Sequence, residues 1–268
     1  MQNRIMITGA GSGLGREIAL RWAREGSRLA LADINEAGLR ETLELVRAVG
    51  GDGFTQRCDV RDYSQLVALA ESCEARFGGI DIIVNNAGVA SGGFFEDLSL
   101  EDWDWQLSIN LMGVVKGCKA FLPLLERSKG RIINIASMAA LMQGPAMSNY
   151  NVAKAGVLAL SESLLVELGQ RGIAVHVVCP SFFQTNLLDS YRGPNPEMKE
   201  QIGKLLAGSP ISAADIAEYI YQAVARGEFL ILPHELGRAA WQLKRQDPQA
   251  IYAEMARMAE KMRAKSGR

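Results

Sequence analysis

The chain has 268 residues and a formal net charge of −1, with 48% hydrophobic and 22% charged side chains. This composition is typical of soluble proteins, the length suits one large α/β domain, and the near-neutral charge does not suggest a nucleic-acid partner. Strand-like sequence begins by Arg4, no uncharged apolar run approaches a membrane span, and the four cysteines show no CxxC spacing. We therefore expect a cytoplasmic protein with reduced cysteines.

The first predicted strand, 4–8, runs directly into the glycine-rich segment 9–15 (GAGSGLG), and helical patterning follows at 17–25. Glycines let backbone N–H groups approach a pyrophosphate, and the N-terminus of a helix adds partial positive charge. A glycine motif by itself could be only a flexible turn. The strand before it and the helix after it favour a nucleotide site.

A second predicted strand, 29–32, ends at Asp33. A carboxylate at this position can bind the adenosine ribose hydroxyls of NAD and repels the 2′-phosphate of NADP, although Asp33 could also cap the next helix. The alternation continues through helix 36–49, strand 53–58 with Asp59 and Val60 after it, helix 63–77 and strand 80–84. Alternating strands and helices predict a parallel, doubly wound sheet.

Polar residues follow two further strands of this sheet. Strand 80–84 ends in Asn85–Gly88 (NNAG), and strand 131–136 leads to Ser137, both at the carboxyl edge where ligands of such sheets bind. A long helix is predicted over 99–125 between them. Asn110 borders its apolar stripe and is either a hydrogen-bonded residue between helix and sheet or a site residue.

The segment SNYNVAK places Tyr150 and Lys154 four residues apart, in a helix predicted to run to about residue 170. This spacing brings the phenol and the ammonium to one face, one turn apart. A nearby cation lowers the pKa of a phenol, so the pair could exchange a proton with an alcohol or carbonyl oxygen. Because the same spacing occurs by chance in many helices, the pair alone does not define an active site.

The last third of the chain contains a predicted strand at 173–179, an irregular segment at 186–209, a helix at 213–226 and a strand at 229–232. A final helix is predicted after Pro248, with one narrow apolar stripe formed by Ile251, Met255, Met258 and Met262. This helix could pack on the protein, cover a substrate cleft as a lid, or lie on an anionic membrane, and packing is our preferred interpretation. We expect one domain over 1–240 and a helical extension over 241–268.

Only two histidines are present, which argues against several kinds of site. His176 lies in the apolar run 173–179 and is expected to be a core residue, whereas His234 follows Pro233 in a predicted loop. Neither is surrounded by Cys, His or carboxylate residues, so no metal site is expected. The absence of a GxSxG motif argues against a Ser–His–Asp hydrolase.

Taken together, six features resemble the single-domain branch of the short-chain dehydrogenase/reductase family: TGAGSGLG (8–15), Asp59, NNAG (85–88), Asn110, Ser137 and YNVAK (150–154). The resemblance spans about residues 3–232 and implies a Rossmann-like fold with seven parallel strands in the order 3-2-1-4-5-6-7. It implies four catalytic roles: general acid/base for Tyr150, ribose binding and lowering of the tyrosine pKa for Lys154, substrate polarisation for Ser137, and a relay water held by Asn110.

The resemblance also implies a cofactor site, and NAD is expected there rather than NADP because of Asp33. Arg16 is the one nearby cation that could weaken this expectation. The cofactor-binding residues would be Gly9, Ser12, Gly13, Leu14, Gly15, Asp33, Asp59, Val60, Asn86, Ala87, Gly88, Tyr150, Lys154, Pro180, Phe183 and Thr185. One departure from the family is that Ser181 stands where a glycine is usual, and a phenylalanine follows where a smaller aliphatic residue usually meets the nicotinamide.

The sequence does not identify the substrate. The expected wall of its site consists mainly of Phe94, Met138, Met147, Phe182 and Leu187, with Phe95, Met142, Leu188 and Tyr191 as further candidates. No cation is evident among these residues to hold a carboxylate, so a rather apolar substrate is expected.

The leading hypothesis is an NAD(H)-dependent oxidoreductase acting on a secondary alcohol or ketone. Alternatives are an NADP-dependent carbonyl reductase, the epimerase/dehydratase branch, and a non-enzymatic NAD-sensing regulator, which would be expected to lose the tyrosine or the lysine. A homodimer or homotetramer is expected, formed through the helices of Asn110 and Tyr150, where the small residues Ala155, Ala159 and Ser163 would allow close approach.

Overall fold

The computed structural model describes residues 3–184, 190–193 and 196–265. Within them, a parallel sheet of seven strands has the order β3-β2-β1-β4-β5-β6-β7. The strands are β1 Arg4–Thr8, β2 Arg28–Asp33, β3 Asp52–Arg57, β4 Ile82–Asn85, β5 Arg131–Ile135, β6 Ala174–Val178 and β7 Leu230–Ile231. The predicted doubly wound sheet and its strand order are therefore confirmed.

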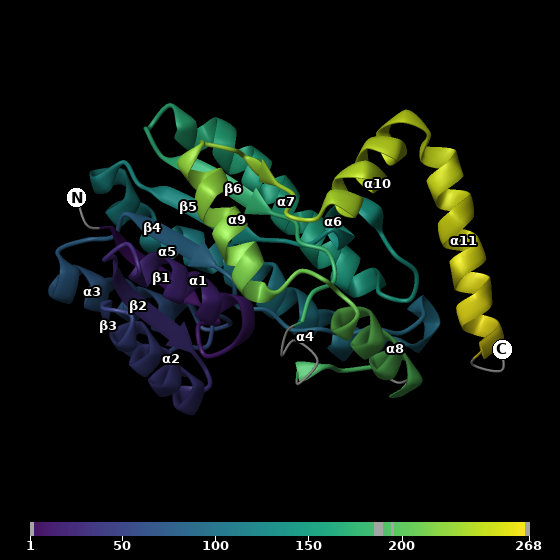
Figure 1. Cartoon of the computed structure of the whole chain (residues 1–268), viewed down its shortest axis with the longest axis horizontal. Coiled ribbons are helices and arrows are strands. Elements are labelled where there is room, and N and C mark those ends of the chain that lie inside the picture. Colours follow the sequence, from purple (N-terminus) through teal and green to yellow (C-terminus); the bar gives the residue numbers. More distant parts are fainter. Residues whose placement is uncertain (1–2, 185–189, 194–195, 266–268) are drawn as a thin grey trace.

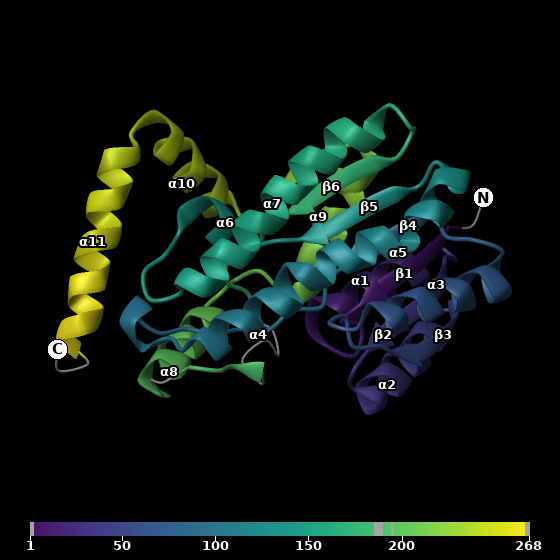
Figure 2. The same ribbon diagram turned by 180° about the vertical axis from the view of Figure 1, so that it is seen from behind.

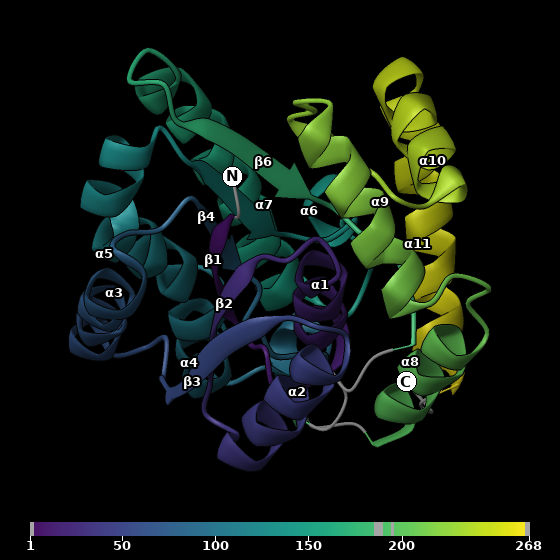
Figure 3. The ribbon, with the colours of Figure 1, turned by 60° about the vertical axis from the view of Figure 1, so that its left-hand side comes forward.

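Helices cover both faces of the sheet, as Figure 3 shows. On one face are α1 Gly13–Ala23, α2 Glu36–Ala48 and α9 Ala213–Ala225, and on the other are α3 Tyr63–Phe77, α5 Met112–Ser128 and α7 Ser148–Gly169. Strand β1 shows how the chain supplies both cores, because Ile5 and Ile7 face α1 and α9 whereas Met6 between them faces the opposite cluster. Successive side chains of a strand point to opposite faces, so a doubly covered sheet needs continuous apolar strands.

The long helix predicted over 99–125 is wrong in one respect, because it is two helices. α4 Leu100–Asn110 and α5 are separated at Leu111, which has φ −114° and ψ −61°. α4 packs on α7, whereas α5 packs on α3. Residues 100–128 together have the length and apolar composition of a candidate membrane span, but helix α5 contributes Val114, Phe121 and Leu125 to the core.

The C-terminal third contains helices that the sequence analysis did not predict. α8 Pro196–Ala207 lies in the segment expected to be irregular, and α10 Glu235–Gln246 follows His234, which lies in the loop after β7 as predicted and is the N-cap of α10. Two further short elements outside this third were not predicted either: the helix α6 Ala139–Met142, which follows Ser137, and the 3₁₀ turn η1 Phe95–Asp97. Pro196 is the first residue of α8, a position at which the fixed φ of proline favours the start of a helix.

The predicted final helix is α11 Pro248–Lys265, which turns back from α10 and runs along the outside of the molecule (Figures 1 and 2). At its start Ile251 is buried. At its far end the Arg263 guanidinium pairs with Glu96 at 2.7 Å and lies 4.1 Å from the centre of the Phe94 ring. The far end of α11 thus contacts this chain's own domain, which is consistent with the packing interpretation.

Candidate functional site

The turn after β1, which we call the cradle, leads into a helix whose first N–H groups are not capped by a side chain. Helix α1 begins at Gly13, inside the glycine segment, and its N-cap Ser12 makes no side-chain capping hydrogen bond. The first turn of α1 also carries no acidic residue, so its N–H groups and partial positive charge remain available to an anion. Gly9 has φ +67°, and a Cβ on Gly15 would overlap the Gly9 carbonyl oxygen. These features fit the pyrophosphate of a dinucleotide.

Asp33 lies against this cradle. Its carboxylate accepts hydrogen bonds from the N–H groups of Gly11 and Asn35, both at 2.9 Å. The N-cap of α2 is Asn35, whose side chain accepts from Gly38, so the capping alternative considered for Asp33 does not hold. Asp33 therefore remains beside the glycine turn as a fixed negative charge.

Arg16, the cation that could weaken an NAD preference, is engaged by other groups. Its guanidinium pairs with Glu41 at 2.7 Å, contacts the Thr42 hydroxyl at 3.0 Å and donates to the Gly11 carbonyl at 2.8 Å. The Arg16 guanidinium also lowers the pKa of Glu41, so this pair is ionised at neutral pH. Any 2′-phosphate would have to compete with Glu41 for Arg16.

The NNAG segment joins the turn after β4 to the glycine turn. The Asn86 amide donates to the carbonyls of Thr8 and Gly9 at 3.0 and 3.1 Å, and the Thr8 hydroxyl accepts from the N–H groups of Asn86 and Ala87. Asn85 instead points into the core and donates to Asn134 at 2.9 Å. The first asparagine of the motif is thus structural, whereas the second fixes the cradle.

Gly88 connects the cradle to the residues predicted to be catalytic. A Cβ on Gly88 would lie 3.2 Å from the Asn110 amide oxygen and 3.7 Å from the Lys154 ammonium. Asn110 is fully buried, and its amide both accepts from the Val89 N–H and donates to the Val89 carbonyl, each at 2.9 Å. Its side chain therefore fixes the loop after β4, and the water predicted for it remains a prediction.

Ser137, Tyr150 and Lys154 converge at the carboxyl end of β5. The Ser137 side chain lies close enough to the Tyr150 phenol to lower the pKa of that phenol. The buried Lys154 ammonium donates to the Ile135 carbonyl at 2.9 Å and lies 5.8 Å from the centre of the Tyr150 ring. The predicted helical spacing thus places phenol and ammonium on one face of α7, beside the serine that ends β5.

Burial sets the protonation of this group. Burial raises the pKa of Tyr150, and the interaction with the Ser137 side chain offsets only part of this effect. Burial also lowers the pKa of Lys154 to about 8. Burial therefore dominates the pKa of Tyr150, and the expected lowering of that pKa by Lys154 stays a prediction. At neutral pH the phenol is protonated and the lysine is mainly charged.

The predicted substrate wall is only partly assembled. Phe94 and Met138 are buried, Met147 is half-buried, and Phe182 is 41% exposed. The chain around Gly93 pairs with Met147 through a bridge in which the Gly93 N–H donates to the Ala146 carbonyl at 2.9 Å.

Other predicted residues lie elsewhere. Phe95 is 72% exposed and contacts Trp103, so it does not belong to the wall. Tyr191 donates to the Gly92 carbonyl at 3.0 Å. Thr185, Leu187 and Leu188 lie outside the described residues.

The remaining predicted cofactor residues contact their own surroundings in different ways. Leu14 and Val60 are buried, and Val60 lies against Gly113. The Asp59 carboxylate pairs with Arg61 at 2.6 Å, and the hydrogen bond from Arg61 lowers the pKa of Asp59. Asp59 is therefore occupied by Arg61 rather than free to hold a ligand through its carboxylate.

The segment after β6 is held at several points. The Pro180 carbonyl accepts from the Met138 N–H at 2.8 Å, and Phe183 is buried in the core beside α9. The Ser181 N–H donates to Nδ1 of His234 at 3.1 Å. The sequence analysis did not assign His234 to the site, because its contact with Ser181 joins residues 53 positions apart.

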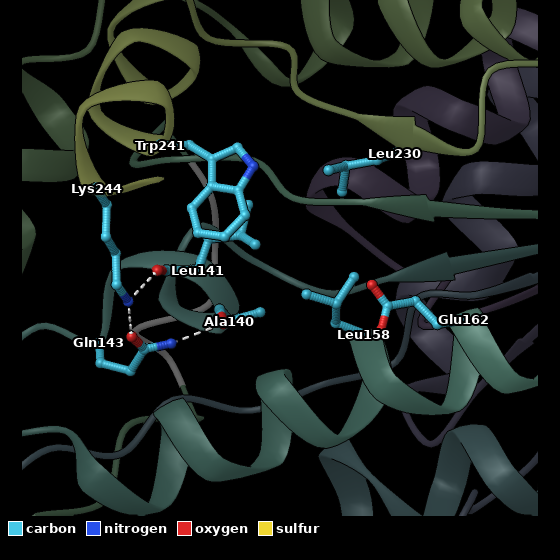
Figure 4. A pocket seen from close by; sticks show the side chains of 8 residues that line it. All are labelled: Ala140, Leu141, Gln143, Leu158, Glu162, Leu230, Trp241 and Lys244. Carbon is cyan, nitrogen blue, oxygen red and sulfur yellow. Dashed lines mark hydrogen bonds between the residues drawn. The ribbon is translucent and has the colours of Figure 1, made fainter. Parts of the chain in front are cut away.

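A separate cavity of about 240 Å³ lies between α6, α7 and α10 (Figure 4). Trp241 forms one wall, and Lys244 donates to the Leu141 carbonyl at 2.6 Å. Its lining residues are Ala140, Leu141, Gln143, Leu158, Glu162, Leu230, Trp241 and Lys244. None of the predicted site residues lines this cavity, which marks where α10 docks on α6.

Comparisons with known proteins agree with this geometry. The sequence profile described as short chain dehydrogenase matches residues 3–195. The probable oxidoreductase EphD of Mycobacterium tuberculosis is 37% identical over 232 residues, covering 83% of this chain and 39% of EphD. A putative ketoacyl reductase of Streptomyces coelicolor is 34% identical over 234 residues, covering 83% of this chain and 90% of that protein.

Among solved structures, a short chain dehydrogenase/reductase from Burkholderia phymatum in complex with NAD has a TM-score of 0.88 and 32% identity. The match covers 93% of this chain and 95% of that one. The chain thus matches this dehydrogenase over nearly its full length, but spans only about two fifths of EphD.

Proposed function

The chain belongs to the short chain dehydrogenase family, and on that premise we propose that it transfers a hydride between NAD(H) and a secondary alcohol or ketone. The observation that carries this proposal is the meeting of Ser137, Tyr150 and Lys154 beside the glycine cradle, to which Gly88 connects them. Hydride transfer at a carbonyl also moves one proton, and these three side chains supply the groups for that proton.

Each side chain has a separate task in ketone reduction. The nicotinamide, when bound, supplies the hydride. The Ser137 hydroxyl orients the substrate oxygen, and the protonated Tyr150 phenol donates its proton to that oxygen. The Lys154 ammonium then stabilises the phenolate that remains. In alcohol oxidation the same proton returns to Tyr150.

NAD is proposed as the cofactor in preference to NADP. The support is Asp33, a fixed carboxylate at the glycine turn, and the engagement of Arg16 by Glu41. The NAD complex of the Burkholderia relative is consistent with this choice. An NADP-dependent carbonyl reductase is the competing enzyme and would require Arg16 to leave Glu41.

The proposed substrate is a rather apolar alcohol or ketone. Support comes from the apolar side chains around the site, Phe94, Met138, Met147 and Phe182. A ketone on an acyl chain, as the name of the Streptomyces relative suggests, belongs to this class. A non-enzymatic sensor would have no need for Tyr150 and Lys154 with the contacts described above.

We further propose a cytoplasmic homodimer or homotetramer formed through α7. Ala159 and Ser163 are exposed, so packing on the sheet does not account for them, and they lie between exposed Val152 and Val166 on the same helix. A second copy could approach closely over these small side chains.

Replacement of Tyr150 by phenylalanine tests the activity. Tyr150→Phe keeps the ring and removes the proton, so turnover with NAD(H) and a panel of secondary alcohols and ketones should fall by about 10²–10⁴. Binding of NADH, measured by fluorescence, should persist. The matched control is Tyr221→Phe on α9, where the ring contacts Trp22 away from the site. Retention of more than a tenth of turnover by Tyr150→Phe would contradict the role.

A further inference from the structure

His234 makes an unusual contact for a residue that begins a helix. It occupies the N-cap of α10 but its side chain caps none of the helix N–H groups. The ring is instead buried, with 8% exposure, and Nδ1 accepts the hydrogen bond from the Ser181 N–H at 3.1 Å. An N-cap side chain usually satisfies its own helix, so this imidazole is committed to another segment.

The segment that His234 contacts is 180–184, at the carboxyl end of β6. The Pro180 carbonyl is fixed by Met138, and Phe183 is fixed by burial. Between these two anchors Ser181 is held by His234, and the Phe182 main chain also interacts with the ring. Phe182 itself remains 41% exposed. The imidazole therefore controls the peptide groups next to the most exposed residue of the proposed substrate wall.

The contact requires a neutral ring. Because Nδ1 accepts, the imidazole proton is on Nε2, which is buried and has no hydrogen-bond partner among the described residues. Burial lowers the pKa of His234, the Phe182 main chain opposes part of this effect, and the charge of Arg238, one turn further along α10, lowers the pKa further. The ring is thus uncharged at neutral pH and can accept at Nδ1.

We propose that His234 is a positioning residue for the site: through Nδ1 it fixes the Ser181 peptide and thereby the course of segment 180–184 past cofactor and substrate. The inference rests on the proposed function for its effect on binding, but the hydrogen bond itself does not. It also gives α10 a role, because the same first turn places Gly237 against Met138 of the substrate wall. The helix after β7 thus supports two sides of the site.

Two substitutions separate the nitrogens of the ring. His234→Asn places an acceptor near the position of Nδ1, whereas His234→Gln places its amide near Nε2 and leaves the Ser181 N–H without a partner. In the nucleotide-free protein, hydrogen exchange of the Ser181 amide should be slow in the wild type and in the His234→Asn variant. It should be at least about tenfold faster in the His234→Gln variant, as expected for loss of one buried hydrogen bond.

Binding and kinetics should divide in the same way. His234→Gln should raise the substrate KM and the Kd for NADH by about tenfold, and His234→Asn should stay within about threefold of the wild type. His176→Gln is the matched control, because that ring is equally buried on β6 and its Nδ1 contacts the Glu228 carbonyl. It should lower the melting temperature without changing KM or Kd.

Three outcomes would overturn the proposal. The first is slow exchange of the Ser181 amide in His234→Gln, and the second is KM and Kd values in His234→Asn as high as those in His234→Gln. The third is a His234→Gln variant that loses only stability, as the His176→Gln control does. A wild-type protein without oxidoreductase activity would instead contradict the proposed function. The Ser181 exchange would still report on His234 in that case, so the two failures are distinguishable.

Discussion

Removal of the Asp33 charge should relax the choice between NAD and NADP. Asp33→Asn keeps an oxygen that can accept from Gly11 or Asn35 but removes the negative charge held against the glycine turn. A unit charge about 4 Å from another like charge costs on the order of 4 kcal/mol at an effective dielectric constant of about 20, and salt reduces this value. Selection of NAD by at least about a hundredfold requires about 2.7 kcal/mol, which one carboxylate can supply.

The assay is steady-state kinetics with both cofactors and one alcohol substrate. We expect the wild type to prefer NAD by at least about a hundredfold in kcat/KM, and Asp33→Asn by less than about tenfold. Asp52→Asn is the control, because Asp52 is exposed and begins β3 at the amino end of the strands, opposite the carboxyl end at which Asp33 lies. It should leave the preference unchanged.

The Arg16–Glu41 pair allows a second step in the same test. Glu41→Gln releases Arg16, so in the Asp33→Asn background it should favour NADP further, whereas alone it should change the preference little because Asp33 still repels the phosphate. Comparable kcat/KM values with NAD and NADP in the wild type would refute the reasoning. An unchanged preference for NAD in Asp33→Asn would refute it as well.

Three further predictions follow from the site and the helices around it. Burial holds the pKa of Lys154 at about 8 and raises that of Tyr150, so kcat/KM for ketone reduction should be constant near neutral pH and fall above about pH 8. A rise of kcat/KM above pH 8 would contradict the roles of these two residues. Deletion of 247–268 removes a helix that is buried at Ile251 and paired at Arg263, so the melting temperature should fall by about 2–4 °C for each kcal/mol of unfolding free energy that is lost. An unchanged fold with a higher substrate KM would instead indicate that α11 is a lid. Loss of liposome binding alone would indicate a membrane contact. Ala159→Arg places a charge on the exposed face of α7 and should give a monomer in light scattering without altering the fold, and an unchanged oligomer would place the interface elsewhere.

Local pattern was sufficient for the central elements of the fold. The apolar strand 4–8, the glycines and the helix after them follow directly from periodicity and turn chemistry, because each depends on neighbours in the sequence. The helical spacing of Tyr150 and Lys154 is of the same kind. These residues do lie on one face of α7, with Ser137 beside them at the end of β5.

The tertiary structure decided what depends on distant partners. The break at Leu111 is one example, because the apolar stripe is continuous across it and only the structure separates α4, which packs on α7, from α5, which packs on α3. The direction of the Tyr150 pKa shift depends on burial by surrounding elements, which the sequence spacing of Tyr150 and Lys154 does not reveal.

His234 shows the same limit most directly. In the sequence it follows a proline and carries no motif, and only the return of the chain after β7 brings its Nδ1 to Ser181. Hydrogen bonds within a helix or turn can be predicted from the sequence because the number of residues between donor and acceptor is fixed. A bond across 53 residues has no such spacing, and the folded sheet alone determines which side chain meets the site.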